Sequence, residues 1–212
     1  MDRHRRSRSA GPSAQRLRDP RSEAAHLVGE LLSDDEARAE AAVLALGRRG
    51  ASALDIVLPL CDSPEAETRW WALRAAAEIF DPRASAALAA ALEDPDLAVR
   101  QAAALGLRLQ PNPGAAAALA RRLADSDALL ARLASDALAA VGAAALPDLR
   151  RAAAASATGT RIHAVRALSL MKNPAAASDL FAALEDPSTL VQHWAERGLE
   201  DLGVGMVFFP SS

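Results

Sequence analysis

Residues 91–109 read ALEDPDLAVRQAAALGLRL, in which a short acidic segment with a proline separates two apolar runs. Asp94 and Arg100 in this stretch fit either part of a catalytic site or the joint between two helices. The arrangement recurs, with its polar position at residues 40, 69, 100, 132, 161 and 192, in steps of 29, 31, 32, 29 and 31. A fixed period of this size indicates a repeat array. We therefore interpret the stretch as a repeated joint.

The composition favours helices in every repeat. Apolar residues make up 51% of the chain but aromatic residues only 3%, and Asp81-Pro82, Asn112-Pro113 and Asn173-Pro174 are suited to begin helices, because Asp or Asn caps the first turn and proline fits its first position. A single helical hairpin cannot bury its apolar stripe without neighbours. We therefore expect an all-α fold, an α-solenoid (right-handed superhelix) of about six antiparallel helical hairpins with a period near 31.

The chain divides into three segments by charge and periodicity. Residues 1–21 hold seven arginines against two aspartates, a net charge of +5, and lack apolar periodicity, which predicts a disordered Arg-rich arm. Because the whole chain carries −3, the remainder carries −3 − 5 = −8. Residues 22–203 form the expected repeat domain, and residues 204–212 a C-terminal tail. We favour a solubilising arm over a nucleic-acid tether, and a tail that caps the last repeat over a docking peptide or dimer contact.

Three stretches carry a resemblance to a known family. DPDLAVRQAAALGL (94–107), SPEAETRWWALRAAAEI (63–79) and DPSTLVQHWAERGL (186–199) resemble HEAT repeats, specifically the short bacterial HEAT-like type that also occurs in phycobilin lyases. The resemblance covers roughly residues 22–203. It implies an armadillo-like helical solenoid in which the second helix of each hairpin lines the concave face.

The acid and arginine of each joint are predicted to form a structural ladder. The acid caps the second helix, and the arginine bridges its own acid and that of a neighbouring repeat. Exposed ion pairs contribute only about 0–1 kcal/mol each, so we expect the ladder to set the stacking register. Its predicted members are Asp62, Arg69, Asp94, Arg100, Asp125, Arg132, Arg161 and Asp186.

Side chains that depart from the repeat pattern are the candidates for a binding site. The two residues after each ladder position are unremarkable in three repeats and include Trp or His in the other three, and arginines follow one turn later. The predicted partner-binding residues of the concave face are Trp70, Trp71, Arg74, Arg108, His163, Arg166, His193, Trp194 and Arg197. Two basic, aromatic patches of this kind suit an acidic or phosphate-bearing peptide. The alternative for Trp71 and Trp194 is that they fill space between alanine-rich helices.

No residue presents a catalytic pattern. The single cysteine, Cys61, excludes an internal disulfide framework and a cysteine-based metal cluster. The histidines are His4, His26, His163 and His193, and none begins a His-Glu pair, which argues against deoxyhypusine hydroxylase, a HEAT-repeat di-iron enzyme. We expect no cofactor and no metal site.

The favoured function is a non-catalytic scaffold or adaptor that binds a protein or peptide partner through its concave face. One alternative is a phycobilin lyase-like enzyme or lyase subunit. Another is a nucleic-acid-binding HEAT-like protein, which the acidic body disfavours. The sequence shows no secretory signal and no apolar run that we judge long enough to span a membrane, so we expect a cytoplasmic protein.

Overall fold

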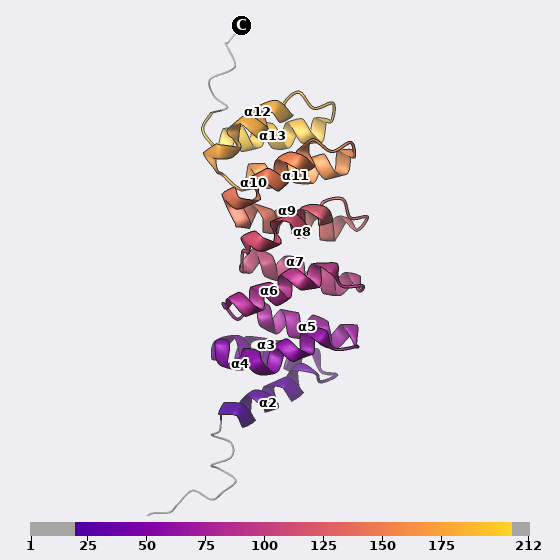
Figure 1. The fold of residues 1–212 in the computed structure, drawn as a ribbon, viewed down its shortest axis with the longest axis vertical. Coiled ribbons are helices and arrows are strands. Elements are labelled where there is room, and N and C mark those ends of the chain that lie inside the picture. Colours follow the sequence, from indigo (N-terminus) through magenta and orange to yellow (C-terminus); the bar gives the residue numbers. More distant parts are fainter. Residues whose placement is uncertain (1–19, 205–212) are drawn as a thin grey trace, which may run out of the picture.

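The computed structural model describes residues 20–204 as a stack of six antiparallel helical hairpins (Figure 1). The first helices of the hairpins are α2 (Pro20–Leu31), α4 with η1 (Ala51–Val57 and Leu58–Asp62), α6 with η2 (Pro82–Ala90 and Ala91–Glu93), η3 with α8 (Pro113–Ala115 and Ala116–Arg122), η4 with α10 (Gly142–Ala145 and Leu146–Ala153) and η5 with α12 (Pro174–Ala176 and Ala177–Ala183). The second helices are α3 (Glu36–Arg49), α5 (Ala66–Ala77), α7 (Leu97–Leu109), α9 (Ala128–Val141), α11 (Thr158–Leu170) and α13 (Thr189–Asp201). The described residues contain no strand, so the all-α solenoid prediction is confirmed. Most of the predicted arm and tail lies outside the described residues, in 1–19 and 205–212.

Short polar side chains and glycines set the ends of the helices. The side chains that accept N–H groups at helix starts are Asp35, Asp81, Asp96, Asp127, Asn112 and Asn173. Gly50 and Gly142 end α3 and α9 with φ angles of 60° and 72°, a backbone conformation that glycine adopts without steric cost. The repeat boundaries therefore follow from local sequence.

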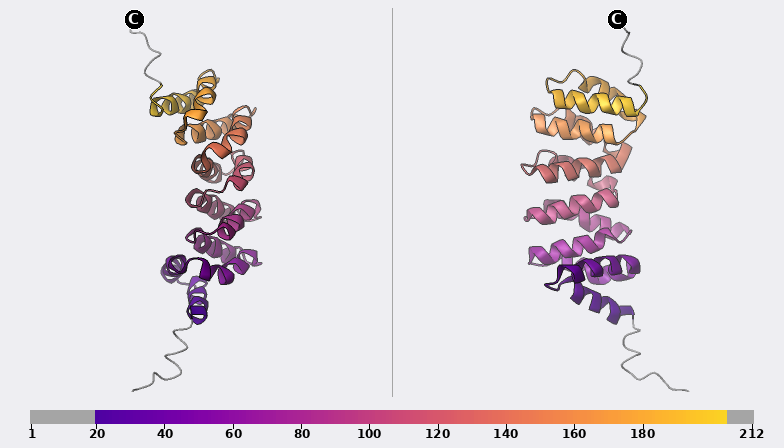
Figure 2. Two further views of the ribbon diagram at one scale, coloured as in Figure 1. Left: turned by 60° about the vertical axis from the view of Figure 1, so that its left-hand side comes forward. Right: turned by 180° about the vertical axis from the view of Figure 1, so that it is seen from behind.

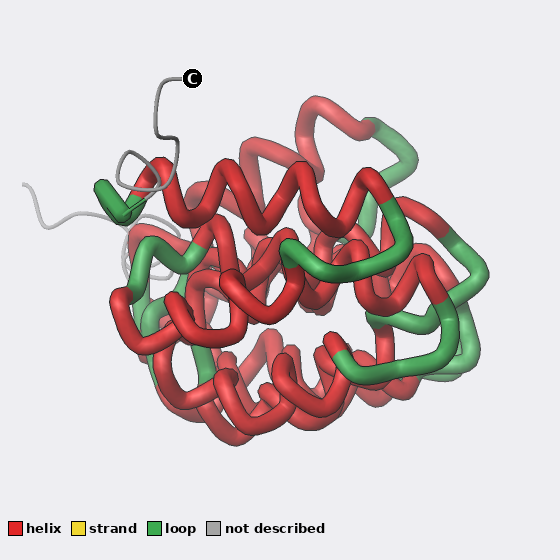
Figure 3. Tube along the Cα trace, turned by 90° about the horizontal axis from the view of Figure 1, so that it is seen from above, coloured by secondary structure: helices red, strands yellow, loops and turns green. Residues whose placement is uncertain are grey.

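The second helices pack side by side along the stack, whereas the first helices contact their neighbours less. Figure 2 shows this row of second helices from behind, and Figure 3, along the stack, shows the turns gathered at the helix ends. Closer packing of the second helices is the arrangement expected of the concave side of a solenoid. We call the outward side of α3, α5, α7, α9, α11 and α13 the second-helix face.

The core consists of leucine and alanine at fixed positions of each repeat. The eleventh residue after the N-cap of the second helix is a buried leucine in five repeats, namely Leu46, Leu107, Leu138, Leu168 and Leu199. In α5 this position is Ala76, and the buried Trp71 lies in the same core cluster and supplies a large side chain there. Trp70 and Cys61 pack against both this N-terminal cluster and the larger C-terminal one.

Adjacent helices approach too closely for a large side chain at one position, the tenth after the N-cap. This position is alanine in four repeats and glycine in two, Gly106 and Gly198. A Cβ at Gly198 would lie 2.9 Å from the Ser169 Cα and 2.8 Å from the Leu180 Cδ1. A Cβ at Gly106 would lie 2.6 Å from the Leu88 Cδ2. Small residues at this position are therefore a condition for stacking.

The repeated arginine binds its own turn and, at two interfaces, the next repeat. Arg69 Nη1 donates to the carbonyl oxygens five and six residues before it, and its Nε and Nη2 each donate to an Asp94 carboxylate oxygen at 2.8 Å. Arg161 binds Asp186 in the same way, at 2.7 and 3.1 Å. The Arg69 and Asp94 side chains are 12% and 9% exposed, so this pair is largely removed from water. Arg100 makes the two carbonyl bonds, at 2.7 and 3.0 Å.

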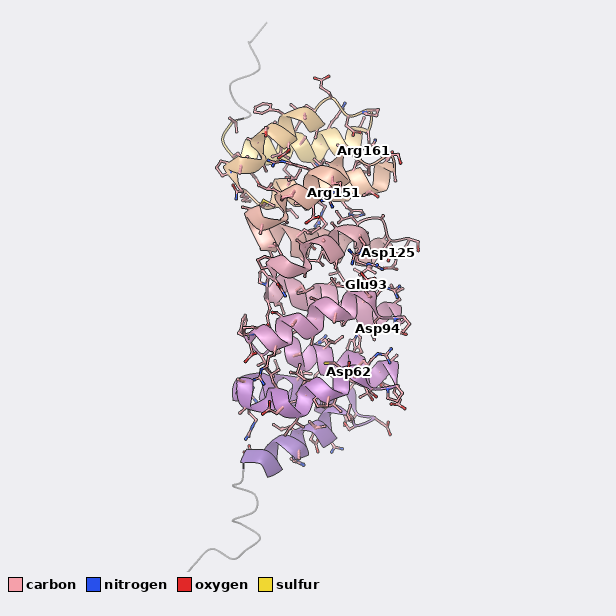
Figure 4. The ribbon with its side chains drawn as sticks, viewed as in Figure 1. Asp62, Glu93, Asp94, Asp125, Arg151 and Arg161 are labelled. Atoms are coloured by element: carbon pink, nitrogen blue, oxygen red, sulfur yellow. The ribbon has the colours of Figure 1, made fainter. Side chains whose placement is uncertain are left out.

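Two predicted ladder members, Asp62 and Arg132, lie off the ladder. The ladder side chain is the fourth residue after the N-cap, which in repeat four is Ala131, and Arg132 is exposed. The acid position is two residues before the N-cap, which in repeat two is Ser63. The prediction was wrong at both positions because it placed the arginine seven positions after the acid. The turn fixes this separation at six positions, as from Asp94 to Arg100. Figure 4 shows Asp62, Asp94, Asp125 and Arg161 along one edge of the stack.

Between repeats three and four, Arg100 and Asp125 are both present, but among the described residues Arg100 binds the carbonyl oxygens of its own turn and Asp125 pairs with Arg122. At two further interfaces without a ladder pair, the arginine and the acid are absent together. The two positions between repeats four and five are Ala131 and Ala155, and those between repeats one and two are Ala39 and Ser63. A largely buried charge without its partner is strongly destabilising. The paired absence therefore leaves neither of these two interfaces with an isolated ladder charge.

A second set of ion pairs joins the first helices of neighbouring repeats. The pairs are Arg83–Asp55, Arg121–Glu93, Arg122–Glu93 and Arg150–Asp179, with N–O distances of 2.7 to 3.0 Å. Most of these side chains are well exposed, so each pair adds little stability. Together they connect the first helices of neighbouring repeats, two of them through Glu93, the residue before the ladder acid Asp94.

One stretch of the described residues, Ala128–Ala153, is long and apolar enough to span a membrane by length and composition. The expectation that the sequence contains no such run was therefore wrong. In the structure this stretch is α9, η4 and α10, with a turn at Gly142. Many of its apolar side chains, such as Leu130, Leu138 and Leu149, lie in the solenoid core.

The helix crossing predicts opposite effects for one substitution at two glycines. Gly198→Ala is expected to destabilise the fold by about 1–3 kcal/mol, because the added Cβ meets the Ser169 backbone. Gly29→Ala, in α2 with no atom near its added Cβ, is expected to stabilise by up to about 1 kcal/mol through helix propensity. Urea unfolding at pH 7 measures both. A gain in stability from Gly198→Ala would show that the close approach is not required.

The ladder pairs predict a loss of stability in acid. Hydrogen bonds from Arg69 and Arg161 hold the pKa of Asp94 and of Asp186 below the ordinary carboxyl value. Their contribution is fully present above the unfolded-state pKa of about 3.9 and is lost as pH falls through the lowered folded-state pKa. The stability difference between the wild type and Arg69→Ala should therefore be constant from about pH 5 upward and shrink below about pH 4. Gln192→Ala, which removes an uncharged ladder residue, is the control. A difference in unfolding free energy between the wild type and Arg69→Ala that stays constant down to about pH 3 would contradict this role.

Candidate functional site

A cavity opens on the second-helix face of the first three repeats. It has a volume of about 350 Å³ and crosses the first turns of α3, α5 and α7. We call it the Trp70 pocket, and its lining residues are Glu36, Ala66, Glu67, Trp70, Trp71, Asp96 and Ala98. The pocket therefore draws its walls from three consecutive repeats.

The Trp70 ring is held in place from two sides. The edge of Trp71 meets it with ring centroids 4.7 Å apart and an interplanar angle of 83°. The Arg74 guanidinium carbon lies 5.3 Å from its centroid, which is cation–π distance. Arg74 in turn binds Glu40 of the preceding repeat at 2.8 Å. Trp70 is thus a partly exposed, pre-oriented aromatic wall.

Carboxylates dominate the remainder of the Trp70 pocket. Glu36 and Glu67 are exposed, and neither has a hydrogen-bond or ion-pair partner within residues 20–204. Asp96 accepts the N–H groups of Ala98 and Val99 as the cap of α7. No basic side chain lines the pocket. The predicted basic patch at Trp70 and Arg74 was therefore wrong, because Glu40 engages Arg74 and the first-turn glutamates reverse the local charge.

The two adjacent tryptophans have different roles. Trp71 is 7% exposed and belongs to the N-terminal core cluster, so it forms the floor of the pocket and fills space between alanine-rich helices. Trp70 is intermediate in exposure and presents its ring to the pocket. Of the two tryptophans, Trp70 therefore offers a partner the larger exposed ring surface.

A second aromatic group lies on the same face in repeats four to six. Arg166 binds Asp136 at 2.8 Å and the Ser135 hydroxyl at 3.0 Å, and its guanidinium carbon lies 5.4 Å from the Trp194 centroid. Arg197 lies 5.8 Å from the same ring. Trp194 therefore contacts two arginines, of which Arg166 already has an acidic partner.

The remaining predicted residues do not make this second group basic. Burial, and secondarily the charge of Arg166, lower the pKa of His163, so its imidazole is neutral at pH 7. His193 and Arg197 line a cavity of about 360 Å³ together with Glu196, Glu200 and Asp201. Arg108 is exposed in the last turn of α7 and lines neither this cavity nor the Trp70 pocket. The C-terminal group is mixed in charge.

Two kinds of residue were missed in the sequence. Glu36 and Glu67 lie in the first turns of α3 and α5. The sequence feature that could have identified them is an acidic residue in the first turn of the helix that carries Trp70 and of the equivalent helix in the preceding repeat. Gln110 is buried, and its side-chain amide donates to the carbonyl oxygens of Ala76, Ala77 and Ile79 at 2.8 to 2.9 Å. Gln110, which belongs to the following repeat, thereby supplies hydrogen bonds to the carbonyl oxygens at the C-terminal end of α5 and joins the two repeats.

The described residues offer little for covalent or metal chemistry. Burial, with the nearby charge of Asp62, raises the pKa of the Cys61 thiol to about 11, so it stays protonated at neutral pH. A protonated thiol is a poor nucleophile. Within residues 20–204, no three His, Cys, Asp or Glu side chains gather in a way that could hold a metal ion.

The different roles of the two tryptophans predict different stabilities. Trp71→Ala is expected to cost about 3–5 kcal/mol of unfolding free energy, because it empties a buried site between helices. Trp70→Ala should cost clearly less, since part of its ring is already in water. Urea unfolding of the two variants measures the difference. Equal losses would place Trp70 in the core as well.

Comparisons with known proteins agree with this architecture. The family model of HEAT repeats matches residues 24–108, 54–139 and 116–200. The complex of CpcE and CpcF of phycocyanin lyase from Nostoc sp. PCC7120 is similar at TM-score 0.52 and 21% identity, covering 96% of this chain and 82% of that chain. A designed armadillo repeat protein in complex with the peptide (KR)4 is similar at TM-score 0.52 and 18% identity, covering 85% and 99%. No curated protein sequence matches. The chain belongs to the HEAT-repeat family.

Proposed function

We propose that this HEAT-repeat protein is a non-catalytic scaffold that binds a segment of a protein partner along its second-helix face. The observation that carries the proposal is the Trp70 pocket, in which a partly exposed tryptophan with a fixed orientation lies beside Glu36 and Glu67, two carboxylates that have no partner among the described side chains. Tryptophan contributes a large share of binding energy at protein interfaces. A pre-oriented ring also lowers the entropic cost of binding.

The fold supports an elongated ligand over a small substrate. The Trp70 pocket spans three repeats, and the second aromatic group continues on the same face through repeats four to six. An extended peptide running across the second helices would contact both groups. The designed armadillo repeat protein, which resembles this chain in fold, was solved with a bound peptide.

The two alternative functions receive less support. The similarity to the phycocyanin lyase complex is one of fold, and no described side chain of this chain is assigned a lyase role by it. Nucleic-acid binding requires a basic groove, whereas the Trp70 pocket is lined by three carboxylates and no basic side chain.

Site-specific photocrosslinking tests the proposed face. A photoreactive amino acid at Ala98, exposed on α7 in the Trp70 pocket, is expected to give a covalent adduct with the partner in cells. The same amino acid at Ala117 is the matched control, because Ala117 is equally an exposed alanine but lies on the first helix α8. Adducts from position 117 with none from position 98 would contradict the proposal.

A further inference from the structure

We infer that the Trp70 pocket selects a basic segment of the partner and takes an arginine or lysine side chain between the Trp70 ring and the carboxylates of Glu36 and Glu67. This inference rests on the proposed function and adds the chemistry of the ligand. It reverses the charge expected from the sequence alone, which favoured an acidic peptide.

The charge of the Trp70 pocket is complementary to a cationic side chain. Three carboxylates line the pocket, and the two exposed ones, Glu36 and Glu67, have no partner within the described residues. The two arginines of α5 on either side of Trp70 in the sequence are already engaged, Arg69 by Asp94 and Arg74 by Glu40. An acidic ligand would therefore meet like charge, whereas a cationic side chain would find acceptors without displacing an existing pair.

The protein already makes this kind of interaction within its own chain. Arg74 lies against the Trp70 ring while its guanidinium binds Glu40. Arg166 lies against the Trp194 ring while its guanidinium binds Asp136. In both cases a tryptophan face and a carboxylate from a neighbouring repeat hold one guanidinium. The Trp70 pocket offers the same two components, with carboxylates from α3 and α5, but no arginine of the described part of the chain lines it.

The size of the pocket fits side chains better than a folded domain. A volume of about 350 Å³ lies at the small end of ligand cavities, enough for one or two long side chains. Guanidinium binds carboxylates with two parallel hydrogen bonds and stacks on aromatic rings, so arginine should bind more tightly than lysine. The expected ligand is an extended segment that inserts an arginine here.

A peptide titration with the full chain tests the inference. The probes are two fluorescein-labelled octapeptides of opposite charge, (Lys-Arg)4 and (Glu)8, followed by fluorescence anisotropy at fixed ionic strength. We expect (Lys-Arg)4 to bind and (Glu)8 to bind at least about tenfold more weakly, because each exposed pair formed or opposed changes affinity several-fold.

Matched charge variants separate the pocket from general attraction. Glu36→Gln with Glu67→Gln removes two negative charges at the pocket, and Asp62→Asn with Glu185→Gln removes two exposed ones that line neither the Trp70 pocket nor the cavity beside Arg197. The first pair should weaken (Lys-Arg)4 binding about tenfold and the second less than about twofold. Trp70→Ala should weaken it further, with partial recovery in Trp70→Phe. Equal weakening by both charge pairs would overturn the inference, since the attraction would then be non-specific.

Other outcomes assign the pocket differently. Preferential binding of (Glu)8 would overturn the basic-ligand inference, while a partner adduct at Ala98 would still uphold the second-helix face. Tighter (Lys-Arg)4 binding after replacement of Arg3, Arg5, Arg6 and Arg8 by serine would show that the chain's own N-terminal segment competes for the pocket. That result would overturn the assignment to a partner. Failure of both the peptide titration and the Ala98 crosslink would remove the proposed function itself.

Discussion

The structure depends on how closely neighbouring helices can approach. A hairpin of two short helices has too little apolar surface to fold alone, so each repeat must bury its stripe against the next. Close approach requires a small residue where helices cross, and Gly106 and Gly198 have no room there for an unadjusted Cβ. The alanine-rich, aromatic-poor composition is the consequence of this constraint, because packing here comes from helix proximity and not from large side chains.

The same constraint determines where function can lie. Core and crossing positions are nearly identical between repeats, and the ladder residues Arg69 and Arg161 are used in stacking. The large side chains that depart from the repeat and are partly exposed, Trp70 and Trp194, occur on the second helices. Arg74 beside Trp70 and Arg166 beside Trp194 are held by carboxylates of preceding repeats, Glu40 and Asp136. The exposed glutamates are therefore left to set the charge of the Trp70 pocket.

The period, the hairpins and the family could be predicted because their signals are local: caps, prolines and a spacing near 31 residues. The ladder was misplaced by one residue at Asp62 and Arg132, because the spacing alone does not show where each turn begins. The different burial of Trp70 and Trp71 could not be predicted, because it depends on which side of α5 faces the core. The charge beside Trp70 was predicted with the wrong sign because Glu40 engages Arg74, 34 residues away in the sequence, only after stacking. The pocket is then lined by the carboxylates of Glu36, Glu67 and Asp96.

We propose that the ligand site lies at the residues that depart from the repeat, on the Trp70 side of the stack. The chain has three tryptophans, so its indole N–H signals form a three-line NMR spectrum. Titration with (Lys-Arg)4 is predicted to move the Trp70 signal most, the Trp71 signal slightly and the Trp194 signal least. A spectrum in which Trp194 moves and Trp70 does not would contradict the account.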